Sequence, residues 1–256
     1  MKIRRKNLSS GFSLIEMLLV VAIFTVIIGA IFKQIGTAQF RYKAEDQKLD
    51  LTQQAREFID QFTRDAHQSG YPSPAMYGNR YPIVGISPNT HPANSNLEAV
   101  GLWFISPTDV AFEGDLDGLG NVQVVQYHYD PGASPCPCIR RSSLTKIAAN
   151  PWDQNVPVFY TEVQNLIPGA AIFTAYNANG TPVTLTAGSL STTGQPPTGG
   201  LLLGNDASGI DPTNQASLQS IKAIRINLTL QAPTGDQATR QSIQVNMTGS
   251  ARLPNN

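Results

Sequence analysis

The feature that most constrains this chain is an apolar run near its N-terminus. Residues 12–32 read FSLIEMLLVVAIFTVIIGAIF and contain one charged side chain, Glu16. A helix of this length is about 32 Å long, which is enough to cross the hydrocarbon core of a bilayer. Four basic residues lie within the first six positions, and basic residues favour the cytoplasmic side of a membrane. The sequence therefore predicts a single-pass membrane helix with its N-terminus in the cytoplasm and the rest of the chain outside.

Two ordinary interpretations of this run leave part of it unexplained. A secretory signal peptide has an apolar core of about 7–15 residues followed by small residues. This run is longer, and Phe32-Lys33-Gln34 is a poor cleavage site. A simple signal anchor accounts for everything except Glu16, because a carboxylate inside a spanning helix costs on the order of 3 kcal/mol. Glu16 therefore points to a charge with a function.

The residues around the start of the run resemble a known signal. Lys6 to Glu16 reads KNLSSGFSLIE, which is similar to the class III signal of type IV prepilins and type II secretion pseudopilins. The resemblance implies that prepilin peptidase, a membrane aspartic protease, cuts between Gly11 and Phe12 on the cytoplasmic side. It also implies N-methylation of Phe12 and pairing of Glu16 with the Phe12 amine of a neighbouring pilin. The partners implied are other pilins or pseudopilins and an inner-membrane assembly platform, with membrane lipid around the helix before assembly.

The helix is expected to continue past the apolar run. Residues 33–68 contain no proline and one glycine, and small or apolar residues recur there at intervals of three or four. Ser69-Gly70-Tyr71-Pro72 should end the helix, because glycine can take a left-handed conformation and proline blocks continuation. One helix from Phe12 to Gln68 would be about 85 Å long. The buried positions expected on its second half are Leu51, Ala55, Phe58, Ile59, Phe62 and Ala66.

The remainder of the chain has the composition of a turn-rich β protein, with abundant Gly, Pro, Ser, Thr and Asn. Pro233-Thr234-Gly235 should join the last two strands as a hairpin, and residues 177–219 are expected to form long surface loops. Strands are expected over 81–86, 97–105, 110–113, 122–129, 139–147, 156–166, 170–176, 221–231 and 241–253.

These elements predict an α+β protein, with a long N-terminal helix packed on an antiparallel sheet. The helix would be half transmembrane and half packed on a globular head. The segments are a leader over 1–11, a transmembrane half over 12–32, an amphipathic half over 33–69 and a β-rich head over 70–256.

A second resemblance spans most of the chain. Gln53-Gln54-Ala55-Arg56 to Asp65, Ser69-Gly70-Tyr71, an acidic turn and the C-terminal hairpin are similar to minor pilins of the PilW type and the related pseudopilin J. A major pilin is less favoured because the head is large.

The acidic turn is the one candidate metal site. Residues 113–121 read EGDLDGLGN, and the oxygen-bearing side chains of Asp115, Asp117 and Asn121 suit Ca²⁺. The segment lacks the third Asx residue and the closing glutamate of an EF-hand. An ordinary β-turn explains the same composition, since Asp and Gly are favoured by turn geometry. Both interpretations stay open, and no other cofactor is expected.

The remaining chemistry-bearing residues do not predict catalysis. Cys136 and Cys138 are too close for an easy disulfide and too few for a zinc site, which favours a free or strained pair in an exposed loop. His67, His91 and His128 are scattered, and no nucleophile motif such as G-x-S-x-G is present. We therefore expect no enzymatic activity.

Together with the membrane helix, the resemblance to prepilins implies a structural protein of the bacterial inner membrane that joins a filament. Basic and acidic residues are equal in number, 18 of each, so nothing in the total charge predicts direct nucleic-acid binding. The alternative is a membrane-anchored extracytoplasmic protein that binds or hydrolyses a ligand. Such a tether would more often continue into a flexible linker rich in Pro, Gly and Ser. A third possibility within the pilin-like class is a minor pseudopilin of type II secretion.

Overall fold

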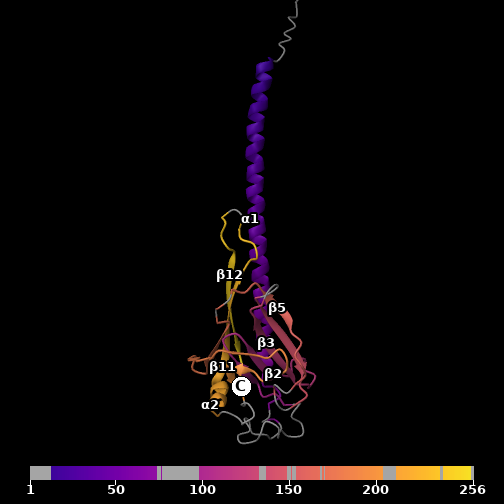
Figure 1. Ribbon diagram of the computed structural model, residues 1–256, viewed down its shortest axis with the longest axis vertical. Coiled ribbons are helices and arrows are strands. Elements are labelled where there is room, and N and C mark those ends of the chain that lie inside the picture. The colour runs from indigo at the N-terminus through magenta and orange to yellow at the C-terminus, as the bar shows by residue number, and fades with distance from the viewer. Residues whose placement is uncertain are drawn as a thin grey trace, which may run out of the picture.

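The structure is a long helix attached to a β-sheet head (Figure 1). This computed structural model describes residues 13–73, 76, 98–132, 137–148, 151, 154–167, 169, 171–203, 212–236 and 239–254. Helix α1 runs from Leu14 to Gln68 without interruption, and the strands that follow pair antiparallel. The predicted α+β architecture is confirmed.

Helix α1 ends where the sequence indicates. Ser69 leaves the helical conformation with φ −57° and ψ 133°, and Gly70 takes a φ of 76°. Ser69 then forms a bridge with Gly114 of the head. A Cβ atom on Gly114 would lie 2.3 Å from the carbonyl oxygen of Gln68, so this close approach of strand to helix end requires glycine. The end of α1 is thus held directly against the head.

The larger sheet has six strands in the order β10-β1-β2-β3-β4-β5. Strands β1 to β4 follow one another as a meander, because short turns connect consecutive antiparallel strands. The bounds are β1 Leu102–Ile105, β2 Val110–Gly114, β3 Gln123–Asp130, β4 Cys138–Thr145, β5 Tyr160–Gln164 and β10 Leu201–Leu202.

A second sheet has four strands in the order β12-β11-β6-β7, and β8 pairs with β9 in a small ribbon. The long hairpin of β11 and β12 pairs from Ala223 with Arg252 to Gln231 with Gln244, as the turn residues predict. The bounds are β6 Phe173–Asn177, β7 Pro182–Val183, β8 Gly188–Ser189, β9 Thr198–Gly199, α2 Pro212–Ser220, β11 Ile221–Gln231 and β12 Gln244–Arg252.

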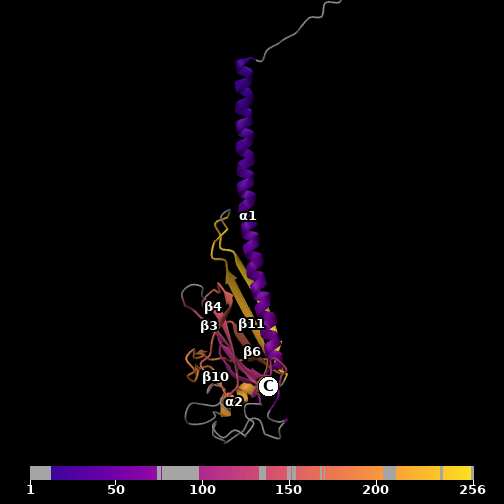
Figure 2. The same cartoon turned by 90° about the vertical axis from the view of Figure 1, so that its right-hand side faces the viewer.

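The second half of α1 lies beside the β11–β12 hairpin, which runs along it in both views (Figure 2). Gly249 on β12 faces the helix, and a Cβ atom there would lie 2.4 Å from the Cγ2 atom of Ile59. Nearer the N-terminus, the side-chain amide of Gln47 donates a hydrogen bond to the hydroxyl of Thr234 in the hairpin turn. The hairpin therefore supports the helix over several turns.

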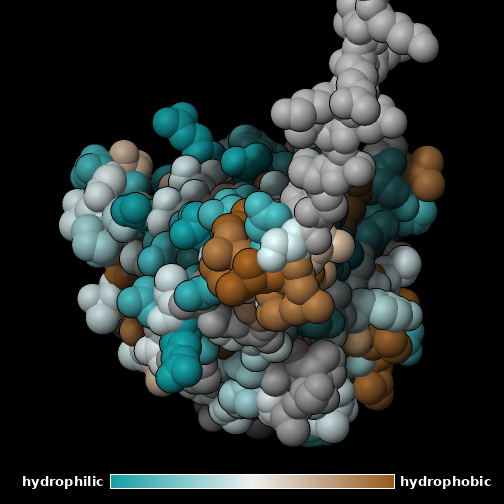
Figure 3. Space-filling view, turned by 90° about the horizontal axis from the view of Figure 1, so that it is seen from above, coloured by the Kyte–Doolittle hydropathy of each residue, from teal (hydrophilic) through white to brown (hydrophobic). Residues whose placement is uncertain are grey.

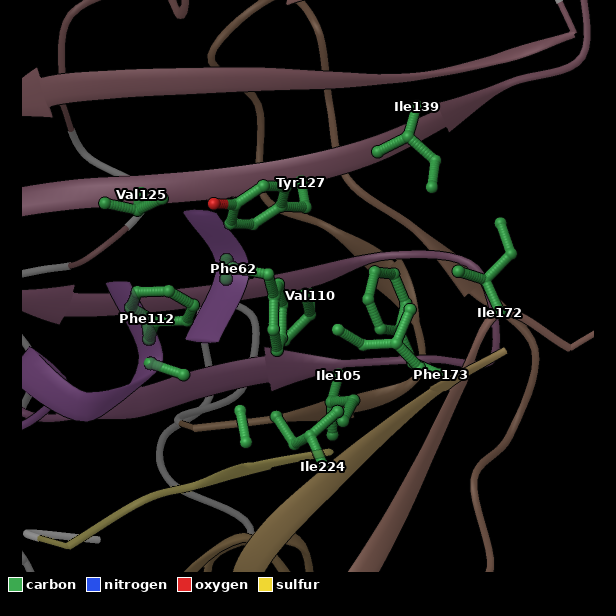
Figure 4. Close-up of a cluster of buried hydrophobic side chains, with 14 of the residues drawn as sticks. Phe62, Ile105, Val110, Phe112, Val125, Tyr127, Ile139, Ile172, Phe173 and Ile224 are labelled. Atoms are coloured by element: carbon green, nitrogen blue, oxygen red, sulfur yellow. The ribbon is translucent and has the colours of Figure 1, made fainter. Parts of the chain in front are cut away.

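An aromatic cluster joins the helix to both sheets (Figure 4). Phe62 of α1 packs against Phe112 and Tyr127 of the six-stranded sheet, with ring centroids 6.2 and 5.1 Å apart. It also stacks on Phe173 of the four-stranded sheet at 5.5 Å. The core of the head therefore closes around one face of the helix, which is the face that the spacing of apolar residues predicts.

Several sequence predictions need correction. Residues 177–219 are not all surface loop, because they contain β7 to β10 and all of α2 but its last residue. Leu190, Leu201 and Leu218 from this stretch are buried, so tertiary packing orders short elements that local composition does not reveal. The strand predicted over 156–166 is shortened to β5, and the one predicted over 97–105 is shortened to β1. The strand predicted over 81–86 lies outside the described residues.

Candidate functional site: the N-terminal helix

The first half of α1 carries its apolar side chains on all sides. Every residue from Leu14 to Phe32 is exposed, and none packs on the head. Viewed down the helix, hydrophobic side chains gather around its tip (Figure 3). Among the described residues, α1 is the helix that is long enough and apolar enough to cross a membrane. A helix that is apolar all round needs lipid or other apolar helices around it.

Glu16 lies in the first turn of this helix and has a partner within its own chain. Its Oε2 atom accepts a hydrogen bond of 3.0 Å from the backbone N–H of Ser13, the residue that precedes the helix. A glutamate at this position satisfies one N–H that the helix itself leaves open. The structure therefore places Glu16 as a cap on the helix start. Gly11 and Phe12 lie outside the described residues.

The second half of α1 is the anchored part. Its buried side chains form one stripe that faces the head: Leu51, Ala55, Phe58, Phe62, Asp65 and Ala66. All members but Asp65 belong to the set that the sequence predicts, and Ile59 is partly buried beside them. The stripe packs the helix from Leu51 to Ala66 onto the head.

Asp65 is the charged exception on this stripe. Its Oδ2 atom accepts hydrogen bonds from the hydroxyl of Tyr127 at 2.6 Å and from Nε of Arg141 at 2.8 Å. The side-chain amide of Gln61 donates to the other carboxylate oxygen at 2.7 Å. Burial raises the pKa of Tyr127 well above its ordinary value, and the neighbouring Asp65 carboxylate acts in the same direction while Arg141 opposes it. This network ties the helix to β3 and β4.

The role of Asp65 in holding the helix to the head was not predicted from the sequence. A signal was available, because Asp65 lies three residues after Phe62 and therefore on the apolar face of the helix. Its partners could not be named in the same way, since Tyr127 and Arg141 are 62 and 76 residues away along the chain.

The acidic turn connects β2 to β3, and its carboxylates accept hydrogen bonds from backbone donors of the turn and from the side chain of the first residue of β3. Asp115 accepts the N–H of Gly120 at 2.9 Å, and Asp117 accepts the N–H of Leu119 at 2.9 Å and the amide of Gln123 at 3.1 Å. Asn121 is exposed. These bonds are those of a turn stabilised by Asp side chains. Among the described residues, no group of three or more His, Cys, Asp or Glu side chains is arranged to hold a metal ion.

The described cysteine and histidine residues lie in the fold as follows: one in a strand, one beside a buried carboxylate and one at a helix end. Cys138 begins β4, is buried and is disulfide-bonded. The predicted exposed loop is therefore wrong for this residue, and of the two predicted alternatives, a free or a strained pair, the free thiol is excluded. The sheet supplies the burial that the sequence alone does not indicate. Cys136 and His91 lie outside the described residues. His128 contacts the buried carboxylate of Asp109 at 2.8 Å, and His67 lies in the last turn of α1.

The similarity of this chain to known proteins lies at its N-terminus, in the membrane half of the helix and the residues before it. Residues 6–32 match the family model of the prokaryotic N-terminal methylation motif. The chain begins with a type IV pilin-like motif. No curated protein and no solved structure matches the chain. The motif implies a pilin-like or pseudopilin protein that prepilin peptidase processes, and with the exposed apolar helix it fits a membrane-anchored protein.

Proposed function

We propose that this chain is a minor pilin-like structural subunit of a type IV pilus or a related filament. In this proposal, prepilin peptidase cuts after Gly11 and methylates Phe12, and the helix then leaves the bacterial inner membrane for the filament core. The head stays outside the cytoplasm. The other partners are further pilins and the inner-membrane assembly platform, and the protein acts without enzymatic activity or a required cofactor.

The observation that carries the proposal is the continuity of α1. The methylation motif and the head are joined by one helix of 55 residues, which is exposed from Leu14 to Phe32 and packs into the head from Leu51 to Ala66. A tether for an independent extracytoplasmic domain has no need of such rigidity. A subunit that must hold its head at a defined distance from a helical core does need it. This rigidity favours the filament subunit over the anchored binding or hydrolytic protein.

Glu16 supplies the chemistry of assembly. Cleavage creates a new amine on Phe12, four residues before Glu16, so the mature helix carries both charges within its first two turns. In the uncut chain the Ser13 N–H already occupies one Glu16 oxygen, which lowers the cost of holding this carboxylate in the membrane. A neighbouring subunit displaced along the helix axis could then offer its Phe12 amine to Glu16. Such a pair compensates both charges in a low dielectric and favours one axial register.

Mass spectrometry of the native protein tests the processing step. The mature chain should begin at N-methylated Phe12. A chain that still begins at Met1 in its native membrane would contradict the proposal and favour a simple anchor. The PilW-like subtype, as opposed to a type II secretion pseudopilin, would be tested by finding which filament contains the subunit.

Two Glu16 variants separate capping from charge pairing. Glu16→Val removes both functions, whereas Glu16→Gln keeps an oxygen for the Ser13 N–H and removes only the charge. We expect both variants to insert and fold, and both to be depleted from sheared filaments. Recovery of Glu16→Val at the wild-type ratio would show that Glu16 does not guide assembly. Recovery of Glu16→Gln alone would assign its role to helix capping.

A further inference from the structure

A group of charged residues is completely buried at the end of the head where α1 docks. Lys146, just after β4, and Glu113, in β2, both have 0% exposed side chains. Glu98, ahead of β1, is also fully buried and contacts the lysine through its backbone. Burying charges is costly, and a buried ion pair stabilises a fold only when the remaining donors and acceptors are satisfied. The hydrogen bonds around Lys146 and Glu113 therefore decide whether an ion pair at this site would be stable.

The pair is held in one geometry by three hydrogen bonds. Lys146 Nζ lies 2.7 Å from Oε2 of Glu113 and 2.8 Å from the carbonyl oxygen of Glu98. The backbone N–H of Val100 donates to the same Oε2 atom at 3.0 Å. The second carboxyl oxygen of Glu113, Oε1, is buried without a hydrogen-bond partner in the described part of the chain.

The hydrogen-bonding capacity of an ion pair does not match this site. An ammonium group has three N–H donors, of which two have partners among the described residues, and the carboxylate keeps one oxygen unpaired. A buried polar group without a partner is expensive. A secondary amide has one N–H and one oxygen. Its N–H would donate to the Glu98 carbonyl, and its oxygen would accept from Val100, so that every polar atom is paired.

We propose that Lys146 and Glu113 are joined by an amide bond between the two side chains, an intramolecular isopeptide crosslink. The site is a self-modification site of the head, and its substrates are these two side chains.

The reaction balances without any other reagent. The ammonium of Lys146 first transfers a proton to the Glu113 carboxylate across their hydrogen bond, which gives a neutral amine and a neutral acid. The amine nitrogen then attacks the carboxyl carbon and forms the C–N bond. The carbon's bond to one hydroxyl oxygen breaks, and this oxygen leaves with a second amine proton as one molecule of water.

The surroundings favour each step. Burial raises the pKa of Glu113 above its usual value, while Lys146 and the Val100 N–H act in the opposite direction, so the neutral acid is more accessible than it is in water. A carboxyl C=O bond is about 1.23 Å long, so an amine 2.7 Å from the oxygen lies within about 4 Å of the carbon. Two well-oriented groups held this close can react as if one were present at an effective concentration of about 10⁵ M or more around the other.

The crosslink would reinforce the connection between the helix and the head. It would join β2 to the segment after β4, the two neighbours of β3 in the sheet. The backbone carbonyl of Glu113 also accepts the N–H of Gly70 at 2.8 Å, immediately after α1. A pull on the helix would therefore reach a covalently closed part of the sheet.

Intact mass spectrometry of the purified full-length chain tests the proposal. After reduction and denaturation, the wild-type chain should be lighter than its sequence mass by one water molecule, once leader removal and methylation are counted. Proteolysis should release one branched fragment that contains both Glu113 and Lys146. Lys146→Arg keeps the positive charge but should have the full sequence mass and lack the branched fragment.

The wild-type measurement decides the question even if the variant fails to fold. A wild-type mass equal to the sequence mass would overturn the proposal and leave a buried ion pair, with trapped water satisfying the remaining groups. A missing water that persists in Lys146→Arg would place the dehydration elsewhere in the chain and overturn it equally. Neither outcome bears on assembly of a filament, because the Glu16 variants test that separately.

Discussion

Truncating Phe62 to alanine should release α1 from the head more than any exposed change on the same helix. Phe62 is 0% exposed and contacts three rings that come from both sheets, Phe112, Tyr127 and Phe173. Losing this side chain leaves a cavity where the helix and the two sheets meet. The neighbouring strands cannot collapse to fill it without breaking their pairing, so the full cost of the cavity should be felt.

The expected loss is about 3–5 kcal/mol of the free energy of unfolding, the usual range for a buried Phe→Ala change. For a domain of 150–250 residues each kcal/mol lowers Tm by about 2–4 °C, so Tm should fall by roughly 6–20 °C. Thermal unfolding of the full chain in detergent can be followed by tryptophan fluorescence, because Trp103 is buried in the head. Helix insertion should be unchanged, since the membrane half does not contact Phe62.

Leu49→Ala is the matched control. Leu49 lies on the same helix but is 68% exposed, and exposed substitutions usually change stability by less than about 0.5 kcal/mol. If Phe62→Ala lowers Tm by no more than Leu49→Ala does, the aromatic cluster does not hold the helix to the head. The packing of Phe62 would then not be what fixes α1 to the two sheets.

Three further predictions concern processing, the acidic turn and pH. Gly11→Val should slow cleavage by prepilin peptidase because a larger side chain crowds the scissile bond. A ratio of precursor to mature protein equal to that of the wild type would contradict this. If the acidic turn binds Ca²⁺, millimolar Ca²⁺ should raise Tm and Asp117→Ala should abolish the rise; a Tm indifferent to Ca²⁺ returns the segment to a turn. Because the pKa of Tyr127 is raised in the folded state, its contribution to stability is complete below its unfolded pKa of about 10 and is lost as pH rises further. The Tm of the wild type should therefore fall more steeply above that pH than the Tm of Tyr127→Phe, and parallel curves would refute the argument.

The acidic turn illustrates how far composition alone can lead. Asp115, Asp117 and Asn121 have the right atoms for Ca²⁺ or for a turn, and the sequence favours neither decisively. The structure shows both carboxylates accepting hydrogen bonds, from Gly120 and Leu119 in the turn and from Gln123 at the start of β3. Spacing along the chain reports which oxygens are near one another, but the direction of each carboxylate depends on the backbone conformation.

The sequence by itself determined the features of this protein that depend on neighbours a few residues apart. The apolar run, the helix end at Gln68, the buried stripe around Phe62 and the β11–β12 hairpin all follow from local periodicity and turn chemistry. Only the tertiary structure decided which distant segments meet. Asp65 contacts Arg141 across 76 residues, and Glu113 contacts Lys146. The short strands β7 and β10 exist because β6 and β1 of the two sheets pair with them. Such contacts depend on how whole sheets pack around the helix, and the free energy that selects them comes from burial, which no short window of sequence contains.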